Sequence, residues 1–228
     1  MQIVFPSAMP WEQRKEIGYG AAIGGTIAGV LLRAYPFFGG RTRERALWPT
    51  VLLGLAFHLV GQIGQTITNL VFLDQTRAEL AQDPLGRTMP WLASREFVLG
   101  ELAVSPFAFL AATFLGAALW ALGLKIVGGL KRPYHVIVRA LCYAQAVSVL
   151  VPIVAPIGHL GPVGGGFVMA FGIWATVIQI VAVSRMQGIE VGRGVLAFFV
   201  WISLAGCVAC AVGSALAWSV ASQIQLPM

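Results

Sequence analysis

The sequence predicts an all-α, polytopic integral membrane protein with five transmembrane helices preceded by an interfacial amphipathic helix. The first observation is composition: 58% of the 228 residues are hydrophobic and only 11% are charged, whereas soluble domains carry about 25% charged residues. The second is a set of apolar stretches, each supplying most of the about 20 residues that cross a bilayer as a helix. The third is the unequal distribution of basic residues among the segments that connect these stretches.

The predicted spans form one membrane domain, residues 46–228, because a mostly apolar chain of this length leaves no sizeable soluble domain. Residues 1–45 form a cytoplasmic or interfacial N-terminal segment. The five spans cover approximately residues 47–73, 104–124, 136–154, 163–183 and 195–221.

The basic residues predict the orientation of these spans. Of the 15 Lys and Arg residues, 12 lie before the first span, between the second and third or in the first turn of the third, or between the fourth and fifth. Basic residues accumulate on the cytoplasmic side of a cell membrane, so we expect a cytoplasmic N-terminus and an external C-terminus. The net charge of +6 is divided among short juxtamembrane clusters, which favour the anionic inner leaflet rather than nucleic acid as a partner.

The stretch 17–38 is apolar enough to enter the bilayer, and two interpretations remain open. If it crossed the membrane, Arg33 and the arginines that follow it would be translocated and the charge bias would be lost. Pro36 also ends a helix, and the five glycines of the stretch weaken one. We therefore expect a helix in the cytoplasmic interface, anchored by aromatic side chains. The interfacial motif comprises Trp11, Pro36, Phe37 and Phe38.

The clearest candidate site is a line of uncharged polar residues on the first span, here called the polar stripe. Spacings of three and four place its members on one helix face; they are His58, Gln62, Gln65 and Asn69, with Thr66 beside them. Such groups face other helices or water, because facing lipid is costly. Two interpretations remain open: a hydrophilic path or binding groove, with His58 as a proton carrier, and hydrogen bonding between helices.

Glu101 is the deepest acid of the predicted spans, near the outer end of the second. It either pairs with Arg95 at the interface or reaches a polar cavity near Asn69. We count it with the polar stripe as a candidate groove residue.

Catalytic and cofactor motifs are absent from the sequence, which contains no His-Glu-x-x-His, Gly-x-Ser-x-Gly or nucleotide fingerprint. Cys207-x-x-Cys210 has the spacing of a redox pair or half a metal site. Both cysteines lie among small apolar residues with no second ligand pair, so we interpret them as packing residues. We expect no enzyme activity, no metal and no cofactor.

Several local strings are distinctive in their order and spacing. They lie in the N-terminal segment, at the entry to the third span, at the break before the fourth and in the connection to the fifth. The residues are Pro10-Trp11-Glu12, Gly18, Thr26, Leu31-Leu32, Pro36-Phe37-Phe38, Tyr134-His135-Val136, Arg139-Ala140-Leu141-Cys142-Tyr143-Ala144, Pro152, Pro156-Ile157-Gly158, Trp174, Gly188 and Arg193-Gly194-Val195-Leu196. Together they resemble the YIP family, the Ypt/Rab-interacting membrane proteins.

This resemblance implies a five-span helical fold with a cytoplasmic N-terminus, of a short bacterial type that lacks the long soluble region of eukaryotic members. It implies a non-enzymatic protein that organises or shapes membranes or scaffolds partners, either a second copy of the chain or other membrane proteins. The polar stripe supports an alternative from a different class: a small transporter, channel or lipid-moving protein.

Overall fold

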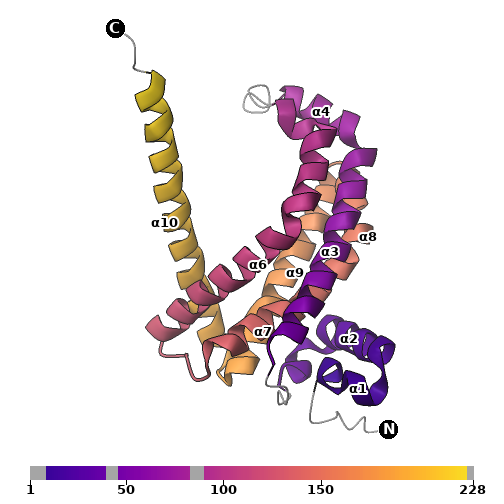
Figure 1. Ribbon diagram of the computed structural model, residues 1–228, viewed down its shortest axis with the longest axis vertical. Helices are drawn as coiled ribbons and strands as arrows, with labels where there is room; N and C mark the ends of the chain where they lie inside the picture. The colour runs from indigo at the N-terminus through magenta and orange to yellow at the C-terminus, as the bar shows by residue number, and fades with distance from the viewer. Residues whose placement is uncertain (1–8, 40–45, 83–89, 225–228) are drawn as a thin grey trace.

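The computed structural model describes residues 9–39, 46–82 and 90–224, and every regular element in them is a helix (Figure 1). The elements in chain order are η1 (Pro10–Gln13), α1 (Arg14–Ile17), α2 (Tyr19–Phe37), α3 (Trp48–Val71), α4 (Leu73–Gln82), η2 (Pro90–Ala93), α6 (Arg95–Ile126), α7 (Tyr134–Ala144), η3 (Gln145–Leu150), α8 (Val151–Gly158), α9 (Pro162–Gln187) and α10 (Val191–Ile224).

Four helical stretches of the described chain are long and apolar enough to cross a membrane, so the class of multi-pass membrane protein and the first four predicted spans are confirmed. They are Trp48–Val71, Arg95–Ile126, Tyr134–Gly158 and Pro162–Gln187. The fifth predicted span, 195–221, falls within α10, whose described apolar stretch Val191–Cys207 is shorter than a span. That span remains a prediction.

The second span begins earlier than its apolar stretch indicated. Ser94 caps α6, its Oγ accepting a hydrogen bond from the backbone N–H of Phe97 at 3.1 Å. A serine at this position satisfies an N–H that the first helical turn leaves unpaired. The helix therefore starts at Arg95 instead of residue 104, which places Glu101 well inside it.

The third span lies at the centre of the bundle. Every residue of α7 from Val136 to Ala144 is buried, including Arg139, whose guanidinium donates to the carbonyl oxygen of Ala46 at 3.0 Å. The span then tightens into the 3-10 segment η3 before continuing as α8. Pro152 follows directly, and because proline lacks an N–H, it removes one α-helical hydrogen bond at this junction.

The first span contacts the third through a face of glycines. A Cβ added at Gly54 would lie 2.9 Å from the Cβ of Cys142, and one at Gly61 would lie 2.8 Å from the carbonyl oxygen of Ser148. At Gly64 the added carbon would lie 2.7 Å from the Cα of Pro152. Small residues allow membrane helices to approach this closely, so α3 is held against the whole length of the third span.

Connections that carry basic residues gather at one end of the bundle. Figure 1 shows α1, α2, the connection from α6 to α7 and the connection from α9 to α10 at the end opposite α4. Lys131, Arg132, Arg185 and Arg193 belong to these two connections and the helix turns beside them. The C-terminal end of α10 points to the other end of the molecule.

The N-terminal segment packs against this basic end. Gly18, with φ of 86°, ends α1 and separates it from α2. On α2, Ala22, Thr26 and Val30 are buried at a spacing of four residues, so one face of the helix contacts the bundle. The prediction that Pro36 ends this helix is wrong by one residue: α2 continues to Phe37, with non-helical backbone at Arg33.

Three members of the interfacial motif are buried in protein, and among them Trp11 had been expected as an anchor at headgroup level. Trp11 donates its indole N–H to the carbonyl oxygen of Pro49 at 3.1 Å. Phe37 and Phe38 are both buried, and Phe37 packs edge-on against Tyr143 of α7 with ring centroids 6.0 Å apart. The rings join the segment to the bundle because the start of α3 offers a carbonyl oxygen and α7 an aromatic neighbour. Placement of α2 in the membrane interface remains a prediction.

We predict that Gly64→Ala lowers the free energy of unfolding by about 1–3 kcal/mol, because its Cβ would meet the backbone of Pro152. The measurement is the thermal unfolding midpoint in detergent. The matched control is Gly172→Ala on α9, where nothing lies within 4 Å of an added Cβ and alanine favours the helix. Equal midpoints for the two variants would contradict the close packing of α3.

Candidate functional site: a groove between α3 and α6

The first span has two different faces. Its glycine face contacts the third span, and the polar stripe lies beside that face, with Gly61 and Gln65 lining one hollow. His58, Gln62, Gln65 and Asn69 are each partly exposed and line cavities. Thr66 is buried and lines none of the cavities described below. The structure therefore brings four of the five stripe residues to a common series of hollows.

The outermost hollow lies where α3, α4 and α6 meet. This outer cavity has a volume of about 210 Å³ and is lined by Asn69, Thr76 and Glu101 among others. Of the two alternatives for Glu101, the cavity near Asn69 is the one this geometry favours. Arg95, the other proposed partner, is not among the lining residues.

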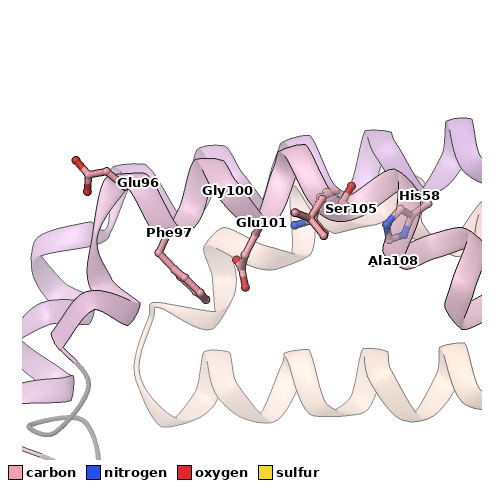
Figure 2. A pocket seen from close by; sticks show the side chains of 9 residues that line it. His58, Glu96, Phe97, Gly100, Glu101, Ser105 and Ala108 are labelled. Carbon is pink, nitrogen blue, oxygen red and sulfur yellow. The ribbon is translucent and has the colours of Figure 1, made fainter.

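Between α3 and α6 lies a groove of about 610 Å³, here called the main groove. Figure 2 shows Phe97 and Glu101 projecting from the same side of α6, with Glu96 at the outer end and His58 of α3 at the other. Gln62 also lines it, together with Gly100, Val104, Ser105 and Ala108. Its walls are thus mainly apolar, with polar groups from both helices.

A third hollow, the inner cavity, continues along α6 beyond the main groove. It has a volume of about 330 Å³ and contains polar groups from several elements: His58, Thr113, Gln145, Gln179 and Trp201. An aromatic cluster lies at its far end. The ring centroids of Trp120 and Trp201 are 6.4 Å apart, and those of Trp201 and Phe198 are 5.5 Å apart.

His58 occupies the junction of these hollows. It lines the main groove, the inner cavity and a smaller hollow of about 170 Å³ that includes Gln65 and Ser148. Its ring stacks on Phe109 with ring centroids 5.1 Å apart and lies beside the backbone of Ser105. Its Nε2 is buried without a partner among the described residues.

Hydrogen bonding between helices accounts for little of the polar stripe. Gln65 donates its side-chain amide to Asn69 Oδ1 at 2.9 Å, which is a bond within one helix. The hydroxyls of Thr66 and Ser105 are buried without partners in the described chain. A buried unpaired polar group costs about 1–3 kcal/mol, so the region carries polar atoms that do not stabilise the bundle.

The sequence did not identify several groove residues. Glu96 and Ser105 lie on α6, where the apolar stretch gave no polar periodicity, and Gln145 and Gln179 are single polar residues on different helices. A pair of glutamates five residues apart was the only available signal on α6. Cavities built from several helices leave no pattern within one segment.

No group of three or more potential metal ligands of the His, Cys, Asp and Glu types occurs within the described residues. No family model, curated protein or solved structure matches the chain. The resemblance to the YIP family therefore rests on its quoted residues alone. Any function must be argued from the geometry of the bundle.

We predict that the triple variant His58→Leu, Gln62→Leu, Gln65→Leu unfolds at the same temperature as the natural chain or at a higher one. The reason is that these side chains line hollows and make few bonds that hold helices together. The measurement is thermal unfolding in detergent. A midpoint several degrees lower would show that the polar stripe is structural.

Proposed function

We propose that this protein is a non-enzymatic multi-pass membrane protein that binds a small polar or polar-headed molecule in the main groove and passes it along the span. This is a transporter or lipid-moving role. We place the protein in the cell membrane with the end that carries α2 in the cytoplasm, on the basis of the basic connections at that end. The groove then opens near the outer surface.

The order of the hollows along α6 supports this proposal. The outer cavity begins at Ala93 and Phe97, the main groove extends from Glu96 to Ala108, and the inner cavity extends from Ala108 to Trp120. From Phe97 to Trp120, a rise of 1.5 Å per residue gives about 35 Å, comparable to the hydrocarbon thickness of about 30 Å. Polar side chains therefore accompany one helix across the apolar layer.

Residues that line two hollows at once support one continuous path and not three separate cavities. Ala108 and His58 line both the main groove and the inner cavity, while Phe97 and Glu101 line both the outer cavity and the main groove. The Trp120 cluster closes the inner end. This arrangement corresponds to a path that is open toward α4 and shut toward α2.

We predict that a cysteine at Gln62 reacts with a membrane-impermeant thiol reagent applied from the outer side. The experiment uses the full chain in proteoliposomes, with Cys142, Cys207 and Cys210 replaced by alanine. The matched control is Ile63→Cys, the neighbouring position on α3, whose exposed side chain lines none of the hollows. Reaction at 62 but not at 63 supports a wet groove; no reaction at 62 from either side contradicts it.

A membrane-organising role is the second proposal, supported by the outer face of the N-terminal segment. Leu32 is 80% exposed on the side of α2 opposite its buried face, and Tyr19, at the start of the helix beside Trp11, is 61% exposed. A helix that shows apolar side chains beside a basic end is suited to the interface of an anionic leaflet. This is the role that the YIP resemblance implies.

We predict that the natural chain draws anionic proteoliposomes into tubules and that the double variant Tyr19→Ser, Leu32→Ser does so several-fold less, as counted by electron microscopy. Both side chains are exposed, so the fold is retained. The control is Leu160→Ser, an exposed leucine next to His159, whose carbonyl oxygen accepts from Gln75 of α4 at the opposite end. Equal tubulation by the natural chain and the double variant would contradict this role.

A further inference from the structure

We propose that the ligand of the main groove is an amphiphile with a cationic, hydrogen-bond-donating head and a hydrocarbon tail, of the class of amine-headed lipids in the outer leaflet. This inference rests on the proposed binding function and adds its ligand class. It follows from the charge of the groove, the kind of hydrogen-bonding atoms it presents and the nature of its walls.

The charged groups of the main groove are all acidic. Its nine lining residues include Glu96 and Glu101 and contain no Lys or Arg. The chain as a whole has a net charge of +6, so this region has the sign opposite to the rest of the molecule. A groove of one sign beside low-dielectric walls concentrates counter-charged ligands.

The deeper polar atoms of the groove are available to a donor. The Ser105 hydroxyl has no partner in the described chain although the residue is only 5% exposed, and His58 Nε2 is likewise buried and unpaired. An imidazole that carries its proton on Nδ1 accepts through Nε2. An ammonium group supplies the matching N–H donors.

The remaining walls suit a hydrocarbon chain. Phe97, Val104 and Ala108 line the groove, and Val104 is 59% exposed on the outer surface of α6. An added Cβ at Gly100 would meet nothing within 4 Å. The groove is therefore open at the side of the bundle, where a tail can remain in the bilayer while the head reaches Glu101 and Ser105.

The test measures binding to the purified, delipidated full chain in a neutral maltoside detergent by native mass spectrometry. The probes share a 16-carbon chain: hexadecylamine is cationic, hexadecanol neutral and palmitate anionic. We expect one hexadecylamine per chain, with a Kd at least tenfold lower than that of either other probe. Equal affinity for the three probes would overturn the proposal.

Charge-matched variants distinguish binding in the groove from binding to charges elsewhere on the surface. We expect Glu96→Gln, Glu101→Gln to raise the Kd for hexadecylamine about tenfold. Glu16→Gln, Glu190→Gln removes the same charge from exposed positions outside the groove and should leave the Kd unchanged. An equal loss in both double variants would assign the binding to surface charge and overturn the site.

A second pair of variants tests the position of the tail. Gly100→Leu places its Cβ where nothing lies within 4 Å, extends its side chain into the groove and should abolish the bound amine. Gly172→Leu, at an equally open glycine of α9, should bind normally. If Gly100→Leu binds hexadecylamine as tightly as the natural chain, the groove is not the site.

Ethanolamine, an amine head without a chain, distinguishes a lipid from a soluble amine. We expect no saturable binding of ethanolamine at millimolar concentration. Ethanolamine binding as tight as that of hexadecylamine would overturn the proposal that the ligand is an amphiphile. Failure of the ligand class is separable from failure of the function. If the Gln62→Cys variant reacts with the thiol reagent but the chain binds the three probes equally, the water-accessible groove is supported and only the amine-headed ligand is ruled out.

Discussion

The close contact between the glycines of α3 and the third span is the constraint on which the rest of the structure depends. Gly54, Gly61 and Gly64 approach Cys142, Ser148 and Pro152 too closely for any larger side chain. This contact fixes the rotation of α3 about its own axis. Because the glycines and the polar stripe occupy different faces of one helix, the same contact turns His58 and Gln62 toward α6.

The bundle combines a closely packed part with a part that contains hollows, and the smallest hollow, which includes Gly61, Gln65 and Ser148, lies between α3 and the third span. The third span and the N-terminal segment form a well-packed body, in which α7 is buried along most of its length and Phe37 contacts Tyr143. The second span and α10 border the hollows. Unpaired atoms such as His58 Nε2 and Ser105 Oγ cost stability without strengthening the packed body. Their position in the groove is the physical argument for a ligand.

The N-terminal segment has a different relation to the membrane from the one its composition indicated. Aromatic residues near a membrane surface are commonly lipid anchors. Here, however, the indole N–H of Trp11 donates to the carbonyl oxygen of Pro49. The Arg185 guanidinium lies over the ring of Tyr35, 4.1 Å from the ring centroid. The segment is thereby attached to α3 and α9 at the basic end. Its exposed apolar and aromatic side chains, which include Ile17, Tyr19 and Leu32, are able to contact lipid or a partner.

The sequence alone determined the helical class, four of the spans and the membership of the polar stripe. Each of these follows from a local property: apolar length against bilayer thickness, or side-chain spacing against the helical repeat. The start of α6 at Arg95 was missed because a polar turn capped by Ser94 precedes the apolar stretch. Only the tertiary structure decided that Glu101 joins Asn69 in one cavity and that Gln145 and Gln179 join His58 in another. Those groupings depend on how helices far apart in sequence are rotated and spaced. The glycine contacts of α3 determine that arrangement, and it cannot be predicted from the periodicity within one segment.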